Sequence, residues 1–353
     1  DAQLSRGLGD VYKRQTVNDV ANVAQFYAIN AKTTSNVILA GGVKDVVTKF
    51  AAANGTATTS LTAMTTQDED VAITITDTVN VAQAVTIANA TTGTVVFEGG
   101  VTDTLANLAS SGSVTSGTTT IVTHDPDVLI TVSGTLDGND VADLNAITAS
   151  TTGKVTASIT ANQAQLVSLT SPNTTDDLTI VVSDVVTVDQ GNTIAKATIN
   201  TTVDFSAAGV NDTFANMLNS NAVHAKLTQI VTKDADVNIV ISDAIENATA
   251  DNIIQLNAIG NTTNGSLTAT IDGNAAELDD LTGNASQSAT CTYTITVDDA
   301  ATVTQGKTIV DATSVATVDF SAAGLTGALA TYIAAAGNGI HASLTDIKNK
   351  DGD

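Results

Sequence analysis

A seven-residue segment occurs twice in this chain without a single change. Val-Asp-Phe-Ser-Ala-Ala-Gly occupies residues 203–209 and again residues 318–324. The similarity continues on both sides, since residues 187–194 return with few changes as residues 302–309. The chain is therefore a repeat array. A repeat unit buries its apolar face by stacking on its neighbours, so we expect an elongated assembly of modules and not a globular enzyme.

A second type of unit lies between these copies. Residues 144–147 and 155–159 return as residues 256–259 and 267–271, and each unit closes with an apolar and polar alternation such as the one over residues 73–77. The period is about 50 to 59 residues, and the two unit types alternate. The expected organisation is an unrelated segment at 1–15, followed by units at 16–77, 78–135, 136–185, 186–244, 245–300 and, truncated, 301–353.

Within a unit, strand and helix patterns alternate. Residues 155–160 and 178–184 are rich in Val, Ile and Thr with a period near two, which predicts strands. Between them, leucines three apart predict a short helix over residues 162–169, with Asn162 as its N-cap, and Asn274 has the same place in the next copy. Further short helices are predicted over residues 141–147 and 253–259.

Strands that alternate with short helices favour parallel pairing through right-handed crossovers. We therefore predict an α/β fold, an elongated repeat solenoid of parallel strands alternating with short helices. The threonines of the strands are expected to line one open face of the sheet, while the apolar residues pack against helices. The alternative is a tandem array of all-β Ig-like sandwiches, each of which needs roughly 100 residues.

The charge balance limits the partners of the chain. It carries 37 acidic against 13 basic residues, a formal net charge of -24, so nucleic acid and anionic membranes are poor partners. No apolar run approaches the roughly 18 residues that span a bilayer, so no membrane insertion is expected. The single cysteine, Cys291, excludes a disulfide within the chain and is expected to be a small buried residue.

The two ends of the sequence differ from the rest. Residues 1–15 contain both arginines of the chain, Arg6 and Arg14, and resemble translated sequencing-adaptor read-through, so we expect them to be no part of the fold. Residues 346–353 stop where earlier units continue into their closing strand. The expectation is a metagenomic fragment of a longer array.

The segment at 144–159, Leu-Asn-Ala-Ile-Thr-Ala-Ser-Thr-Thr-Gly-Lys-Val-Thr-Ala-Ser-Ile, stands in a background rich in Thr, Ala, Val and Asp. Over about residues 16–353 the chain resembles the repeat regions of very large bacterial cell-surface proteins, adhesin-like or surface-layer-like. The resemblance implies export, an extracellular or cell-surface location, and a role as stalk, coat or adhesive segment. It implies no catalytic residue.

The best candidates for site chemistry are acidic. A D-x-D element recurs at equivalent places, with the pairs Asp68 and Asp70, Asp125 and Asp127, Asp234 and Asp236, and Asp351 and Asp353. Carboxylates two apart in a loop can converge on Ca²⁺, which takes six to eight oxygens, and neighbouring units could add Asp77, Asp184 or Asp243. The alternative is that these aspartates cap turns and helices in a solvated loop.

A few other residues invite a role. His224 and His341 are repeat-equivalent, and lone histidines one unit apart predict surface or partly packed residues and not a metal cluster. Phe205, Phe214 and Phe320 are predicted to fill the core.

Three classes of function follow. A non-catalytic structural or adhesive repeat segment, with neighbouring repeats of the same chain as its partners, is favoured because duplicated units contain no unique cluster of catalytic groups. A ligand-binding array would use the threonine face to recognise a regular surface such as glycan, mineral or ice. A solenoid enzyme acting on polysaccharide is less favoured, because the chain has no Trp and only 3% aromatic residues for stacking on sugars.

Overall fold

The structure is a computed structural model that describes residues 15–171, 173–197, 202–205, 209–283, 289–314, 318–320, 324–328, 332 and 339–351. The chain divides into two compact units. Unit 1 comprises Asp1–Thr160, Ser168–Thr179 and Thr198–Thr201, and unit 2 comprises Ala161–Val167, Ile180–Ala197 and Thr202–Asp353. Both contain several of the repeats expected from the sequence, whose boundaries stay a prediction. Of the segment 1–15, only Gln15 is described, and it pairs with Val37 in a short parallel ladder.

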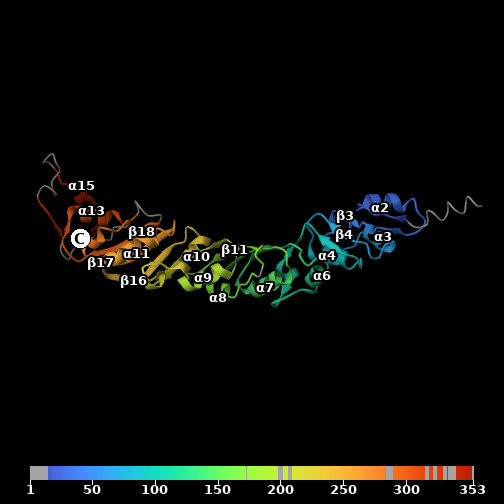
Figure 1. Ribbon diagram of the computed structural model, residues 1–353, viewed down its shortest axis with the longest axis horizontal. Helices are drawn as coiled ribbons and strands as arrows, with labels where there is room; N and C mark the ends of the chain where they lie inside the picture. Colours follow the sequence, from blue (N-terminus) through green and yellow to red (C-terminus); the bar gives the residue numbers. More distant parts are fainter. Residues whose placement is uncertain are drawn as a thin grey trace, which may run out of the picture. The chain divides into compact units, whose positions relative to one another are not determined.

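Short strands and helices alternate through unit 1 (Figure 1). Its strands are β1 (Gln15–Thr16), β2 (Val37–Ile38), β3 (Val43–Asp45), β4 (Ile73–Ile75), β5 (Val95–Phe97), β6 (Val101–Thr104), β7 (Ala109–Ser110), β8 (Ser113–Val114), β9 (Ile130–Leu136) and β10 (Val155–Ala161). Its helices are α2 (Val23–Asn30), η1 (Val47–Lys49), α3 (Thr59–Gln67), α4 (Val81–Ala88), α5 (Leu105–Leu108), α6 (Ser116–His124), η2 (Gly138–Asp140) and α7 (Val141–Ser150).

The same alternation continues in the second half of the chain. After α8 (Gln163–Leu166) and β11 (Asp177–Val182), the helices of unit 2 are α9 (Val188–Ala197), η3 (Ala215–Met217), α10 (Ala225–Lys233), α11 (Ala250–Gly260), α12 (Ala275–Leu278), α13 (Val303–Asp311) and α15 (Ala342–Lys350). Its strands are β12 (Thr202–Asp204), β13 (Val210–Asp212), β14 (Leu218–Asn219), β15 (Ala222–Val223), β16 (Ile239–Ala248), β17 (Ser266–Gly273), β18 (Thr290–Val297), β19 (Ala301–Thr302), β20 (Val318–Asp319) and β21 (Leu325–Thr326).

The strands pair mainly in parallel. In unit 1, β3, β4 and β5 form one parallel sheet, and β6, β9 and β10 pair in parallel in another. In unit 2, β13, β16, β17, β18 and β20 form a five-stranded parallel sheet. Antiparallel pairing is confined to tight hairpins such as β7–β8 and β14–β15 among the described strands. The predicted α/β class with parallel strands is confirmed, and the Ig-like alternative, which needs antiparallel sandwiches, does not describe these residues.

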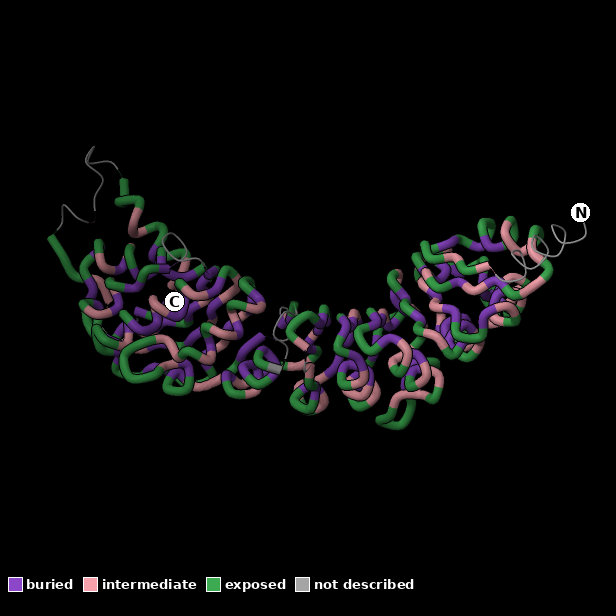
Figure 2. Tube along the Cα trace, turned by 45° about the vertical axis from the view of Figure 1, so that its right-hand side comes forward, coloured by how far each residue is buried: buried purple, intermediate pink, exposed green. Residues whose placement is uncertain are grey.

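The two faces of the central strands differ as the sequence pattern predicts. Strands β17 and β18 run in register over their full length, from Ser266 opposite Thr290 to Gly273 opposite Val297. Alternate apolar residues of both strands are buried: Leu267, Ala269, Ile271, Cys291, Tyr293, Ile295 and Val297. Figure 2 shows such buried residues running through the interior of each unit, with exposed residues on the turns. Because successive side chains point to opposite faces, the threonines between them lie outside the core.

The helices begin at polar caps. Asn162 accepts a hydrogen bond from the N–H of Gln165 and forms a capping box at the start of α8, as predicted. The predicted helix over residues 162–169 ends earlier, at Leu166, although Leu169 is still buried. Asn274 also precedes a helix, α12, but without a side-chain capping bond. The helices predicted over residues 141–147 and 253–259 are confirmed as parts of α7 and α11.

Four equivalent glycines mark the points where the chain changes partner strands. Gly42, Gly100, Gly209 and Gly324 have φ of +77°, +72°, +71° and +67°. Gly42, Gly100 and Gly209 each separate a strand that pairs with an earlier strand from one that pairs with a later strand, whereas β21, after Gly324, pairs with β19. For example, β5 pairs with β4, while β6, directly after Gly100, pairs with β9. Gly209 and Gly324 close the duplicated heptapeptide, which is therefore the site of this partner change.

Glycine is required at these turns for a second reason. A Cβ at Gly42, Gly100 or Gly209 would lie 2.9, 2.8 or 2.8 Å from the backbone oxygens of Ala72, Leu129 and Asn238, respectively. Gly209 leads into a second short strand, β13, which precedes the helical turn η3. The middle of the heptapeptide, residues 206–208 and 321–323, lies outside the described residues.

Candidate functional site

The D-x-D loops follow three equivalent helices. Asp68, Asp125 and Asp234 come directly after α3, α6 and α10 and cap their C-termini. All three are buried, with exposed fractions of 5 to 7%, and the second aspartates of the pairs are exposed. The Oδ2 atom of each buried aspartate accepts a backbone N–H bond from a residue 28 or 29 positions earlier: Leu39 at 2.6 Å, Phe97 at 2.7 Å and Phe205 at 2.6 Å.

The two carboxyls of each pair affect each other. Burial, more than any other factor, raises the pKa of Asp68 and of Asp125, and the adjacent Asp70 and Asp127 raise it further through a hydrogen bond and like charge. The backbone N–H bond opposes this shift but does not cancel it. Burial and the Asp236 carboxyl raise the pKa of Asp234 to about 6. The loop is therefore an electrostatically unfavourable place for two negative charges.

A T-x-G turn from a later segment of the chain lies over each D-x-D loop. Thr151 donates its hydroxyl to the carbonyl of Val128 at 2.8 Å and accepts the N–H of Gly153 at 2.9 Å. A Cβ on Gly153 would lie 2.2 Å from the backbone oxygen of Asp127. Thr91 with Gly93 and Thr263 with Gly265 make the same contacts over the other two loops. Each D-x-D loop is thus held from one side by its own carboxylate and from the other by a T-x-G turn.

The T-x-G turn is the part of this arrangement that sequence reasoning missed. Its signal was present, because a threonine two residues before a glycine recurs at 91, 151 and 263, each time after a D-x-D element. The meaning of the pattern depends on a contact between residues more than 20 positions apart, which no local propensity reports.

Other aspartates cap backbone groups in the same manner. Asp45, Asp103 and Asp212 are the third residues of short strands. Their Oδ2 atoms accept the first helical N–H of Val23, Val81 and Val188 at 3.1, 3.0 and 3.0 Å. A carboxylate at a helix N-terminus is favoured by the helix dipole as well as by the hydrogen bond. These acids join an earlier helix to a later strand.

The additional calcium ligands expected from neighbouring units are not brought to the D-x-D loops. Asp77, Asp184 and Asp243 instead accept backbone N–H bonds from Val47, Gln163 and Phe214 at 2.6, 2.6 and 2.7 Å. No group of three or more Asp, Glu, His or Cys side chains suited to a metal ion occurs among the described residues. Each pair supplies two carboxyls against the six to eight oxygens that Ca²⁺ takes, so the calcium assignment stays a prediction.

The histidines and the cysteine have structural positions. His224 and His341 are N-caps of α10 and α15, where Nδ1 accepts the backbone N–H of Lys226 at 3.1 Å and of Ser343 at 3.2 Å. This pairing requires the neutral ring with Nδ1 unprotonated. Cys291 is fully buried in β18, as predicted, and burial raises the pKa of its thiol. Phe205, Phe214 and Phe320 are buried, as predicted.

An open threonine face lies on β17 and β18. We use this name for Thr268, Thr270, Thr292, Thr294 and Thr296, of which Thr270 and Thr294 are exposed and the others half-buried. Thr268 lies opposite Thr292, and Thr270 lies opposite Thr294. Neighbouring strands are about 4.8 Å apart, so the two threonines of each opposite pair lie side by side on β17 and β18.

Comparison with known proteins assigns no family. No protein-family model matches the chain, and a search of curated proteins finds no relative. Within the part of the chain that the structure describes, no helix combines the length and apolar character needed to cross a membrane. The residues themselves, and not a relative, must therefore support any function.

Proposed function

We propose that this chain is an elongated repeat solenoid and forms a non-catalytic structural or adhesive segment of a large secreted bacterial surface protein. Its partners are then the neighbouring repeats of the same chain. An extracellular location would also agree with the excess of acidic residues, which keeps a surface array soluble.

One observation carries this proposal. The most prominent chemical groups of the chain, its recurring aspartates, accept backbone N–H bonds from residues 21 to 30 positions earlier, as Asp68, Asp77 and Asp184 do. A carboxylate bonded in this way links the segment that carries it to an earlier segment of the chain. The T-x-G turns add contacts in the forward direction. Groups used to join neighbours are what a supporting array needs, whereas a catalytic site would need one unique cluster.

Two measurements test the proposal. Small-angle X-ray scattering of the monomeric full chain should give a radius of gyration well above the value of roughly 20 Å that a globular protein of this length has. Antibodies against the chain should label intact, unpermeabilised cells of the source bacterium. A radius of gyration close to the globular value would contradict the solenoid fold. Antibody labelling that requires permeabilised cells would contradict the surface location.

The open threonine face supports a second candidate, a ligand-binding array for a regular surface such as glycan, mineral or ice. Its support is the two opposite threonine pairs, Thr268 with Thr292 and Thr270 with Thr294. Pull-down on crystalline polysaccharide and on mineral, and ice-affinity partitioning, test it. A variant with Thr270→Lys and Thr294→Lys should lose binding, while Thr152→Lys, at an exposed position outside this face, should keep it. Failure of the unaltered chain in all three assays would remove this candidate.

A further inference from the structure

A hollow of about 370 Å³ in unit 2 is lined by residues from η3, the β14–β15 hairpin, β16 and α11, and we call it the β16 hollow. Its volume is at the small end of the range of roughly 300 to 1,000 Å³ that ligand pockets have. Apolar surface comes from residues such as Phe214 and Ile245, and the polar lining residues are Ser220, Asp243, Asn252 and Gln255. Apolar walls with a few polar groups are the usual composition of a ligand pocket.

Hydrogen bonds within the protein fix three of these polar side chains. The Oδ1 atom of Asp243 accepts the N-cap N–H of η3 at 2.7 Å. The Oδ1 atom of Asn252 accepts the N–H and the hydroxyl of Thr249 at 3.0 and 2.8 Å, in the capping box of α11. Gln255 is only 8% exposed and donates its Nε2 to the Oδ1 of Asn221 at 3.3 Å. Their orientations are therefore set before a ligand arrives.

These bonds leave one donor and two acceptors for a ligand. Among the described residues, nothing else bonds the Nδ2 of Asn252, the Oδ2 of Asp243 or the Oε1 of Gln255. The hydroxyl of Ser220 can donate or accept. A matching ligand must both donate and accept hydrogen bonds over a short distance. The adjacent hydroxyls of a sugar do both, whereas an ammonium group only donates.

Charge narrows the class of ligand further. Asp243 is the acid of the lining, and none of the described residues that line the hollow is basic. Glu246 and Asp251 are exposed nearby in the chain. A carboxylate, sulfate or phosphate on the ligand would therefore meet like charge without a compensating cation. A neutral sugar has hydroxyls for the polar groups and a C–H face for the Phe214 ring.

The first copy of this unit has different residues at two of these positions. Gly134 stands in place of Asp243, and Leu105 stands in place of Phe214. Strand β16 is also ten residues long, three more than its counterpart β9. The same fold forms without the acid, the aromatic ring and the longer strand, so folding does not require these features of the β16 hollow.

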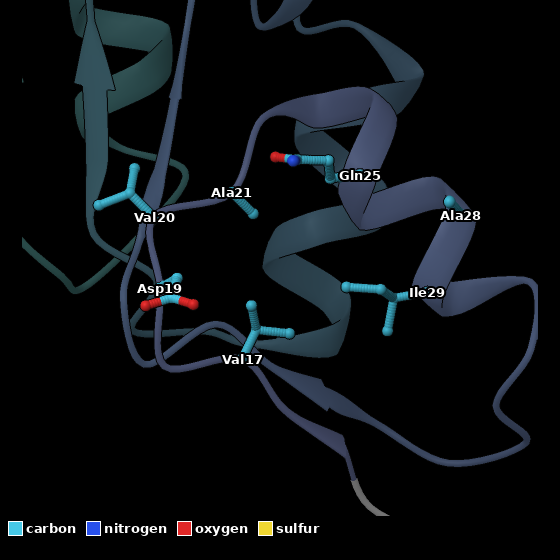
Figure 3. Close-up of a pocket in the computed structure, with 7 residues that line it drawn as sticks. All are labelled: Val17, Asp19, Val20, Ala21, Gln25, Ala28 and Ile29. Atoms are coloured by element: carbon cyan, nitrogen blue, oxygen red, sulfur yellow. The ribbon is translucent and has the colours of Figure 1, made fainter.

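Another hollow, of about 300 Å³, lies beside α2 and lacks this set of groups (Figure 3). Its polar lining residues are Asp19 and Gln25. The Oε1 of Gln25 already accepts the N–H of Asn22 at 2.8 Å in the capping box. This hollow therefore presents mainly apolar surface, and we assign no ligand to it.

We infer that the β16 hollow binds one neutral sugar residue of a glycan. The Nδ2 of Asn252 donates to one hydroxyl oxygen, the Oδ2 of Asp243 and the Oε1 of Gln255 accept from neighbouring hydroxyls, and the C–H face of the ring packs on the apolar wall. The inference deepens the adhesive form of the proposed function, on which it rests, by giving it a ligand class. Further residues of the glycan lie outside the hollow, whose volume suits a single ring.

Ligand-observed NMR titration of the full chain gives the first test. The probes are the methyl glycosides of glucose, galactose, mannose and N-acetylglucosamine, with choline and glucuronate as charged comparisons. At least one neutral glycoside should bind, and neither charged compound should. Absence of binding by all four glycosides would overturn the inference. Binding of choline alone would overturn it in favour of a site for organic cations.

Two variants locate the binding. Asn252→Asp keeps the capping oxygen and replaces the donor by an acceptor, and the first copy already has Asp140 in the equivalent capping box. Asp243→Asn keeps the Oδ1 acceptor and removes the second one. Each should weaken glycoside binding at least about tenfold, with unchanged circular dichroism and thermal midpoint. Asn139→Asp, the same change at an exposed position of the first copy, should bind like the unaltered chain.

Equal binding by both hollow variants and the unaltered chain would place the sugar elsewhere, such as on the open threonine face, and would overturn the inference. The structural form of the proposed function would survive that result if scattering still showed an elongated monomer.

Discussion

The Oδ2 atom of Asp125 accepts a 2.7 Å hydrogen bond from the backbone N–H of Phe97, and both residues are buried. Asp125→Ala leaves this N–H without its acceptor, which costs about 1 to 3 kcal/mol of unfolding free energy. Asp127→Ala should cost little or nothing, because Asp127 is exposed and its charge raises the pKa of Asp125. Urea unfolding of both variants checks the difference. Equal losses of unfolding free energy in the two variants would show that the bond to Phe97 does not explain the contribution of Asp125.

The raised pKa of Asp234 predicts that lowering the pH stabilises the protein over a limited pH range. Burial and Asp236 raise the pKa of Asp234 from 3.8 to about 6 in the folded state. Between these values the folded state binds more protons than the unfolded state, so this contribution is present at low pH and is lost as pH rises through about 6. The unfolding free energy contributed by this group should fall by on the order of 2 kcal/mol from pH 4 to pH 7.

Asp236→Asn isolates that contribution. Removal of the neighbouring charge lowers the pKa of Asp234 towards its ordinary value, so the variant should be more stable than the unaltered chain at pH 7 and similar to it near pH 4. Asp298→Asn, at an exposed position, removes the same formal charge and should show no such crossing. Thermal unfolding across this pH range is the measurement. A stability difference between Asp236→Asn and the unaltered chain that does not change with pH would contradict the raised pKa of Asp234.

The T-x-G turn gives a steric prediction. Gly153→Ala would place a Cβ 2.2 Å from the backbone oxygen of Asp127, so the turn or the loop must shift. We expect a loss of about 2 kcal/mol or more in unfolding free energy, as for other overpacked buried sites. Gly339→Ala is the control, because its Cβ meets nothing within 4 Å. If Gly153→Ala is as stable as the control, the close approach is not required.

Calcium can be tested at the same loops. Two carboxyls at each loop, with no third acidic group beside them in the described residues, lead us to expect no heat of binding and no thermal stabilisation at millimolar Ca²⁺. A clear stabilisation that is lost in Asp127→Asn would instead establish the loop as a calcium site. Mg²⁺ at the same concentration controls for general screening of the charge of -24.

The sequence predicted the local structure well because that information is local. The alternation over residues 155–160 and 178–184 indicated strands, and Asn162 indicated the start of α8, since strand periodicity and N-capping act within a few residues. The division into two unit types is inferred from repetition alone and stays a prediction. The role of Asp125 could not be inferred in this way, because a carboxylate in a D-x-D loop has the same local signal whether it binds a cation or an N–H 28 residues away.

The partner change at the glycines was equally hidden. Residues 203–209 stand out in the sequence as an exact repeat, but the strand pairing after Gly209 depends on a hydrogen bond from the Val210 N–H to the carbonyl of Asn238. Only the stacking of successive segments of the chain brings these two residues together.

The aspartate bonds also restrict how such a gene can change its length. At each D-x-D loop the bond joins a donor and an acceptor 28 or 29 residues apart, as Leu39 with Asp68 and Phe205 with Asp234 do. Loss or gain of a whole repeat leaves every remaining donor with an acceptor, because the new neighbour carries the same pair of groups. Loss of part of a repeat leaves a buried N–H without its acceptor and a buried carboxyl without its donor. Recombination that preserves folding should therefore proceed in whole-repeat steps, and an unaltered heptapeptide copied one double repeat later is the kind of trace that it leaves.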